Sequence, residues 1–193
     1  TTESGGIATF ALRLRQAPTD NVTVHATVSD ATEGKLLQPD NTTTDNLSIV
    51  FTTSDWNSLH TVRVRGLDDN ATDGTQGFWV LLGAAVSNDT RYSGLNLDDV
   101  AVSNRDDDSA GFIVSIPSGS TSEAGDNATF TVRLTSQPSG TVVITVASNK
   151  TTEATVSPTS LSFDASNWST AKTVTASGVN DSSADGDQRY LTT

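Results

Sequence analysis

The sequence contains no cysteine and no methionine, and only 5 of its 193 residues are proline. Without cysteine, the chain can form neither a disulfide framework nor a thiol-based active site. The absence of methionine predicts that these residues are a piece of a longer or processed product. A secreted chain without disulfides needs another source of stability, and a bound metal ion is the substitute that we expect.

Long apolar runs and positive charge are also scarce. No apolar run is long enough to span a bilayer, and no segment has the pattern of a signal peptide. The chain carries 11 Lys and Arg residues against 23 Asp and Glu residues, a net charge of -12. Because phosphate groups repel so acidic a surface, we expect no nucleic-acid partner and no direct membrane insertion.

A helical periodicity is missing as well, and a period of two takes its place. Phe10, Leu12 and Leu14 alternate with less apolar residues, and the same alternation recurs around Val24 and Val62. In a sequence rich in Thr and Val, this pattern is typical of half-buried strands. Short strands separated by turn residues predict an all-β fold of tandem Greek-key or immunoglobulin-like β-sandwiches.

The sequence repeats itself once. Residues 8–14 reappear as residues 128–134, an offset of 120, whereas Trp56 matches Trp168 at an offset of 112. The difference between the offsets makes the first copy 8 residues longer, and these residues lie between about Asp30 and Asn46. A period of this length corresponds to a whole domain rather than to one turn of a solenoid.

The two copies differ at their ends. Residues 112–116 supply a first strand to the second copy, and the first copy has no match for it before Thr1, whereas only the first copy continues to a last strand near Val100. We therefore predict a domain at residues 1–108 without its first strand and a domain at residues 109–193 without its last strands. Because exposed strand edges recruit other chains, we expect neighbouring repeats, or neighbouring chains of a filament, as partners.

An acidic stretch with the spacing D-x-x-x-D-G occurs once in each copy. Asp69 and Asp73 provide its carboxylates in the first copy, and Asp181 and Asp185 provide them in the second. Carboxylates gathered on a tight turn repel one another unless a cation lies among them. We interpret both stretches as calcium-binding loops.

The alternating strand directions of a sandwich bring further acids to these loops. Glu3, residues 68–73 and residues 106–108 are predicted at one end of the first domain, and Glu123 and Asp181 at one end of the second. Calcium takes about six to eight oxygen ligands, whereas magnesium retains water and zinc prefers Cys and His. Residues 106–108 directly precede the second domain, so we expect the ions to stiffen the joint between the domains.

At these residues the sequence resembles the Calx-beta domains, calcium-binding sandwiches of the sodium–calcium exchanger and of large bacterial surface proteins. The resemblance rests on Glu-x-Gly or Glu-Ala-Gly near the start of each copy, on Ser-Asp-Trp-Asn before a strand and on the closing Asp-Asp-Asp. It implies Ca²⁺ as the bound ion. The implied ligands are Glu3, Asp68, Asp69, the carbonyl of Ala71, Asp73, Asp106, Asp107 and Asp108, and in the second copy Glu123, Asp181 and Asp185.

Four residues outside the acidic loops have alternative interpretations. Trp56 and Trp168 occupy equivalent places, which favours a cap on the core over a platform for sugars. Trp79 faces away from its apolar neighbours and is expected to be partly exposed, as an edge contact or a ligand platform. Asp89 is either an additional ligand or a turn-forming residue.

Together these features predict a non-enzymatic calcium-binding repeat of a large extracellular surface protein. It would act as a calcium-stiffened stalk, or as an element of a filament or adhesin at the cell surface. The alternative is an accessory carbohydrate- or protein-binding module of a secreted enzyme. Catalysis by the chain itself is not predicted, because His25 and His60 have no Ser, Cys or acid at the spacing of a catalytic partner.

Overall fold

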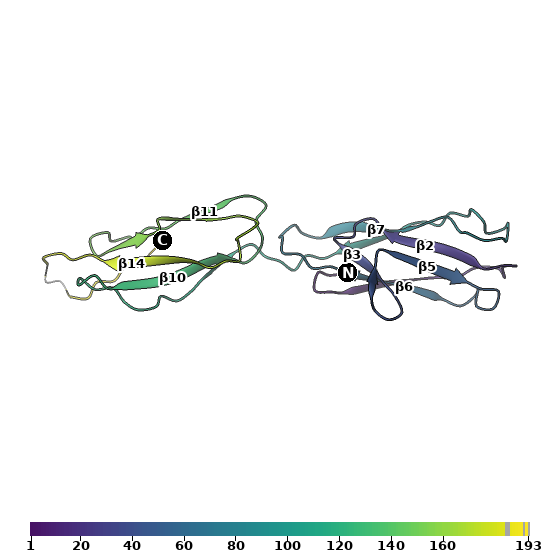
Figure 1. The fold of residues 1–193 in the computed structure, drawn as a ribbon, viewed down its shortest axis with the longest axis horizontal. Coiled ribbons are helices and arrows are strands. Elements are labelled where there is room, and N and C mark those ends of the chain that lie inside the picture. The colour runs from purple at the N-terminus through teal and green to yellow at the C-terminus, as the bar shows by residue number, and fades with distance from the viewer. Residues whose placement is uncertain (184–185, 191, 193) are drawn as a thin grey trace. The chain divides into compact units, whose positions relative to one another are not determined.

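The computed structural model describes residues 1–183, 186–190 and 192. Every regular element in these residues is a β-strand, and the chain divides into two compact units, both drawn as ribbons in Figure 1. Unit 1 comprises Thr1–Asp69 and Asp73–Asp107, and unit 2 comprises Asn70–Thr72 and Asp108–Thr193. A search of the described residues for a helix able to cross a membrane finds none.

Unit 1 is a sandwich of two four-stranded antiparallel sheets, with strand orders β1-β6-β3-β4 and β5-β2-β7-β8. In Figure 1, β2, β5 and β7 form one layer and β3 and β6 belong to the other. The strands are β1 (Ile7–Leu12), β2 (Val22–Val28), β3 (Gly34–Leu37), β4 (Thr43–Thr44), β5 (Asn46–Phe51), β6 (His60–Gly66), β7 (Gln76–Leu82) and β8 (Val100–Asn104).

The core of unit 1 lies between the two sheets, because both contribute alternate apolar residues to it. Along β7, Phe78 and Val80 are buried while Trp79 between them is 50% exposed, as its alternation predicted. Val62 and Val64 of β6 are buried in the same core. Strands whose successive side chains point to opposite faces produce this arrangement, and the predicted all-β sandwich is confirmed.

Unit 2 contains a four-stranded sheet, β12-β14-β10-β9, and a two-stranded sheet, β11-β13. Its apolar core includes Val132, Phe163 and Val174, which come from both sheets. The strands are β9 (Phe112–Val114), β10 (Asn127–Leu134), β11 (Val142–Thr145), β12 (Ala154–Ser157), β13 (Ser160–Phe163) and β14 (Lys172–Gly178).

The internal repeat of the sequence is also a repeat of strand register. Ala8 of β1 lies opposite Val64 of β6, and Ala128 of β10 lies opposite Ala176 of β14 at the same offsets of 120 and 112. The offset is 120 at β3 and β12, and it has changed to 112 by Phe51 and Phe163. The 8 additional residues therefore lie between β3 and β5, where they include β4, a short strand paired with β3.

Candidate metal centre

Acidic residues from separate segments of unit 1 meet where β1 begins and where β6 and β8 end. Antiparallel pairing places Ile7, at the start of β1, opposite Arg65, near the end of β6. A parallel bridge between Thr2 and Arg105 brings the N-terminal segment alongside the residues that follow β8. The topology therefore brings Glu3, the loop after β6 and the acids after β8 to one end of the sandwich, as the strand directions predicted.

Two groups of three carboxylates whose members all belong to unit 1 lie at this end. In each group, every residue offers one carboxylate oxygen, and these oxygens lie within 4.8 Å of one another. The groups are Glu3, Asp68 and Asp107, and Glu33, Asp69 and Asp73. Their donor atoms are all carboxylate oxygens, the ligand type that suits a hard divalent cation such as calcium rather than zinc.

The side chain of Asn104, at the end of β8, is fully buried and connects the segments that carry these acids. Its Nδ2 donates to the carbonyl of Leu67 at 2.8 Å and to Oε2 of Glu33 at 3.3 Å. Its Oδ1 accepts a hydrogen bond of 3.0 Å from the hydroxyl of Thr1. One uncharged amide thus holds the N-terminal segment, the loop after β6 and Glu33 in place.

Gly66, the last residue of β6, gives the N-terminal segment room to pack against this strand. A Cβ atom at this position would lie 2.2 Å from Oδ1 of Asn104 and 2.4 Å from the carbonyl oxygen of Thr2. Both distances are far below van der Waals contact, so only glycine permits this approach. Glu3 is held next to it, where its backbone N–H donates to the carbonyl of Arg105 at 3.0 Å.

The carboxyl of Glu3 has a strongly raised pKa. It is only 3% exposed, and this burial raises its pKa to about 7. The backbone N–H of Asp107 lowers the pKa by donating to Oε2 at 3.3 Å, whereas the charges of Asp106, Asp69 and Asp73 raise it further. A buried carboxylate facing other carboxylates favours either a proton or a metal cation.

Glu33 is the member of the two groups that the sequence analysis missed. Its pKa is also raised, first by burial and then by the charges of Asp73, Asp30 and Asp69. It precedes β3, whose first residue is paired with Gly66, and its own carbonyl accepts a hydrogen bond from Leu67 at 3.0 Å.

The internal repeat contains the signal that identifies Glu33. At the offset of 120 it becomes Glu153, whose carbonyl accepts the corresponding bond from Val179 at 2.9 Å. An acid kept at the same place in both copies, just before a strand, is a reason to include it in the candidate ligand set.

A hydrogen bond also joins the acidic turn to the residues after β8. The backbone N–H of Gly74 donates to Oδ2 of Asp106 at 2.7 Å. Gly74 has a φ of 77°, a left-handed conformation that glycine adopts at little cost. The D-G pair at residues 73–74 thus provides a carboxylate and the turn that anchors it.

No protein-family model matches the chain, and no curated protein matches it. Solved structures do match, among them "Crystal structure of CBD12 from CALX1.2", which is 15% identical with a TM-score of 0.36. The match covers 95% of this chain and 72% of that chain. The matched structure is a Calx-beta domain. Identity this low leaves the ligands to be judged from this chain's own residues.

The remaining predicted ligands are not members of the two groups in unit 1. Ala71 and Asp108 belong to unit 2. Glu123 is exposed, and Asp181 accepts a bond of 2.7 Å from the backbone N–H of Ser183. In the part of the chain that the structure describes, neither Glu123 nor Asp181 joins a group of three acids, and Asp185 lies outside the described residues. A site built from these residues stays a prediction.

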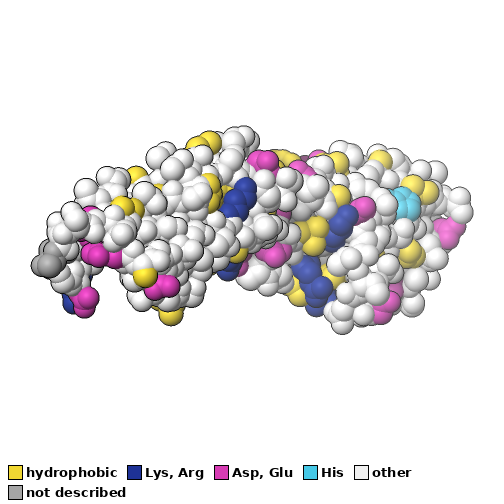
Figure 2. Space-filling view, turned by 60° about the vertical axis from the view of Figure 1, so that its left-hand side comes forward, with side chains coloured by type: hydrophobic (Ala, Val, Ile, Leu, Met, Phe, Trp, Pro, Cys, Tyr) yellow, Lys and Arg dark blue, Asp and Glu magenta, His cyan; other side chains and the backbone are white. Residues whose placement is uncertain are grey.

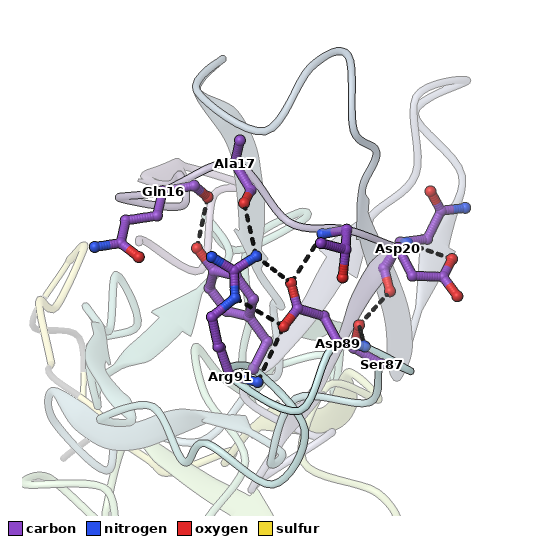
Figure 3. Close-up of polar contacts among 9 residues, drawn as sticks. Gln16, Ala17, Asp20, Ser87, Asp89 and Arg91 are labelled. Atoms are coloured by element: carbon purple, nitrogen blue, oxygen red, sulfur yellow. Dashed lines mark hydrogen bonds and ion pairs between the residues drawn. The ribbon is translucent and has the colours of Figure 1, made fainter.

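Asp89 has a structural environment that favours its interpretation as a turn-forming residue (Figure 3). It is 4% exposed, accepts the backbone N–H of Thr19 at 2.8 Å and pairs with the guanidinium of Arg91 at 2.6 Å. The hydrogen bonds from Arg91 and Thr19 hold the pKa of this carboxyl well below its usual range. Arg91 in turn donates to the backbone carbonyl of Ala17, and the hydroxyl of Tyr92 donates to the backbone carbonyl of Gln16.

Proposed function

We propose that unit 1 binds calcium through the two carboxylate groups at the end of its sandwich. The observation that carries this proposal is the position of Glu3, almost fully buried with one oxygen within 4.8 Å of those of Asp68 and Asp107. Burying a carboxylate among other negative charges is costly unless a cation compensates for it. A divalent ion bound there offsets that cost and draws the three segments together.

The composition of the donor set supports calcium over other ions. The two groups offer six carboxylates between them, and calcium accepts many carboxylate ligands in irregular geometry. Magnesium retains most of its water and takes few carboxylates, and structural zinc sites use Cys and His. Asp106 adds a further carboxylate nearby, since it contributes to raising the pKa of Glu3.

We propose that the chain is a non-enzymatic repeat of an extracellular surface protein, as part of a stalk, filament or adhesin. The internal repeat, the lack of cysteine and the net charge of -12 support this role. Asp107 directly precedes the residues of unit 2 in the chain, so ligation of Asp107 restrains the segment that leads into that unit. Calcium then stiffens the array, and the second copy carries its own site at Glu123, Asp181 and Asp185.

The calcium proposal is tested by replacing Asp69 with alanine and measuring thermal unfolding at increasing calcium concentration. Binding to the native state alone stabilises the parent by about 2.7 kcal/mol at ~100 times the dissociation constant. Asp69→Ala removes a ligand, so calcium stabilises unit 1 of this variant much less, and its unfolding transition shifts less with calcium. Asp98→Ala, which replaces an exposed acid outside both groups, serves as the control and responds like the parent. An equal calcium response in Asp69→Ala contradicts the site that Asp69 forms with Glu33 and Asp73.

A second candidate function rests on Trp79, which is 50% exposed on the outer face of β7. An exposed tryptophan can stack on a sugar ring, which suits an accessory carbohydrate-binding module. Glycan-array binding combined with quenching of tryptophan fluorescence distinguishes the two candidates. A stalk repeat gives no saturable signal, whereas a binding module gives one that Trp79→Ala removes.

A further inference from the structure

The outer face of the sheet that contains β3 and β6 carries positive charge. Val62 and Val64 of β6 are buried in the core, so Arg63 between them and Arg65 after them point to the outer face. Lys35 of β3 lies directly opposite Arg65 and belongs to the same face. These three cationic residues form what we call the basic face of unit 1.

The internal repeat indicates that the fold does not require these charges. The equivalent positions of unit 2 hold uncharged residues: Thr155, Thr175 and Ser177. Thr155 lies opposite Ser177, just as Lys35 lies opposite Arg65. Like charges directly opposite each other on neighbouring strands are destabilising. Unit 1 thus carries a cost at this place that the neutral pair of unit 2 avoids, which favours a role for the charges outside the fold.

Only part of the positive charge of the basic face is neutralised within the chain. Lys35 forms an ion pair with Asp45, whose side chain is 53% exposed. Arg63 donates a hydrogen bond of 2.6 Å to the uncharged Oδ1 of Asn41. Among the ion pairs of the described residues, none involves Arg63 or Arg65. Two guanidinium groups of this face therefore have no carboxylate partner in the part of the chain that the structure describes.

A surface of the opposite charge adjoins the basic face. The loop after β6 begins two residues beyond Arg65, and it carries the exposed acids Asp68 and Asp73. Each belongs to one of the two carboxylate groups at the end of unit 1. A planar guanidinium can donate two parallel hydrogen bonds to a carboxylate, so arginine side chains are well suited to bind such acids.

We propose that the basic face docks on the loop after β6 of a second copy of the chain, where Arg63 and Arg65 pair with Asp68 and Asp73. Because the two surfaces adjoin in each copy, a two-fold arrangement makes both contacts at once and closes as a dimer. The net charge of -12 does not prevent this contact. At physiological ionic strength, charges more than about 8 Å apart are largely screened, so the complementary charges at short range decide the contact.

This interface uses carboxylates that the proposed calcium sites also use. Calcium and the second copy therefore compete for Asp68 and Asp73, so the cation-free chain associates and calcium releases it. The competition rests on the proposed function, whereas the association without calcium does not.

Sedimentation equilibrium of the whole 193-residue chain in EDTA measures the association. We expect a monomer–dimer equilibrium that weakens as sodium chloride is added, because salt screens the paired charges. Arg63→Thr and Arg65→Ser, made together, introduce the residues that unit 2 has at these positions and weaken the dimer at least tenfold. Arg133→Thr with Lys150→Thr removes the same charge from unit 2 and is the matched control, which dimerises like the parent.

Charge reversal identifies the two surfaces that meet. A chain with Arg63→Glu and Arg65→Glu has two acidic surfaces and does not associate with itself. A chain with Asp68→Lys and Asp73→Lys has two basic surfaces and does not associate with itself either. When the two chains are mixed in EDTA they form a dimer, because each carries the surfaces that the other lacks. Thermal unfolding verifies that each variant is folded.

The absence of a dimer in EDTA overturns the proposal. A dimer that the basic-face variant and its control weaken equally also overturns it, as does a failure of the two charge-reversed chains to associate. Calcium is compared with magnesium at the same ionic strength, and only calcium is expected to dissociate the dimer. A dimer that forms in EDTA and persists in calcium supports the interface and contradicts calcium binding at Asp68 and Asp73.

Discussion

Glu3 determines how the acidic end of unit 1 responds to protons. Burial of its side chain raises its pKa from the ordinary value of 4.5 to about 7 in the folded protein. The folded state therefore binds the proton more tightly than the unfolded chain. The stability that this residue contributes is fully present below pH 4.5 and is lost as the pH rises to about 7. Calcium bound at the proposed site would remove that loss, because it would stabilise the ionised carboxylate.

The first prediction concerns Glu3→Gln, which keeps the shape of the side chain and removes its charge. Without calcium at pH 7.5, we expect the variant to unfold at a higher temperature than the parent. Its free energy of unfolding is higher by no more than about 3 kcal/mol, because each pKa unit corresponds to about 1.4 kcal/mol. With calcium, it gains less stability than the parent, because a ligand is missing. Thermal unfolding between pH 4.5 and pH 8, with and without calcium, measures both effects. A variant less stable than the parent without calcium contradicts the assigned pKa.

The second prediction concerns Asp89, whose pKa is lowered by the hydrogen bonds from Arg91 and Thr19. A carboxyl with a lowered folded-state pKa stabilises the fold above its ordinary pKa of about 3.9, and this stability is lost as the pH falls below that value. Asp89→Asn is therefore less stable than the parent at pH 7 and has a flatter pH dependence between about pH 4 and pH 2. Chemical denaturation across this range is the measurement. Asp98→Asn, at an exposed position, leaves the profile nearly unchanged.

The end of β6 is the element on which the candidate metal centre depends. The loop with Asp68 and Asp69 follows this strand directly, and the segment with Glu3 packs against its last residue, Gly66. Asn104, at the end of β8, completes the arrangement from the other sheet. A change in the backbone at Gly66 therefore disturbs both carboxylate groups through the N-terminal segment and the loop.

The third prediction tests this element with Gly66→Ala. The new Cβ would lie 2.2 Å from Oδ1 of Asn104, so the N-terminal segment must shift away from β6. Overpacking of this kind costs about 1–3 kcal/mol, and the displaced Glu3 weakens calcium binding as well. Gly77→Ala is the matched control, because no heavy atom lies within 4 Å of its Cβ position on β7. Calorimetric titration with calcium measures the affinity of the two variants, and thermal unfolding measures their stability. Equal losses in both variants contradict the role of Gly66.

Strand positions could be predicted at this scale, but only some of the loop residues at the candidate site could. The alternation along β1, β2 and β6 indicates strands directly, because the period of side chains in a strand is two. The acids that follow β6 and β8 could be anticipated from strand direction alone. Strand direction alone does not predict Glu33, because its loop reaches the candidate site through the pairing of Gly34 with Gly66; only the match with Glu153 in the repeat points to it. Similarly, the polarity of Asn104 gives no indication of its buried position.

At the scale of the whole chain, negative charges outnumber positive ones, with 23 Asp and Glu residues against 11 Lys and Arg residues. Figure 2 shows Lys and Arg side chains gathered in a few places on the face that it draws, while Asp and Glu side chains are spread more widely. With a net charge of -12, the cation-free protein has strong internal repulsion. The calcium binding that we propose for unit 1 would reduce this repulsion at its acidic end.

The fourth prediction concerns the motion of the two units and rests on the proposed function. If calcium restrains the segment after Asp107, small-angle scattering at saturating calcium gives a narrower distribution of intramolecular distances than in EDTA. Asp68→Ala, which removes a ligand from the group that contains Asp107, retains the broad distribution at calcium concentrations that narrow that of the parent. Measurements in magnesium at the same ionic strength control for simple charge screening. An identical narrowing in magnesium indicates screening and contradicts the proposed stiffening.

The buried amide of Asn104 has a consequence for the speed of ion exchange. Because an uncharged side chain already fastens the N-terminal residues, the stretch after β6 and Glu33 to one another, the carboxylates stand in position before any ion arrives. If the proposed site binds calcium, an incoming ion then only sheds water and is not delayed by rearrangement of the polypeptide. Capture should therefore proceed at close to the rate of ligand replacement in the hydrated ion, and differences in affinity among variants that keep Asn104 should come from the rate of escape.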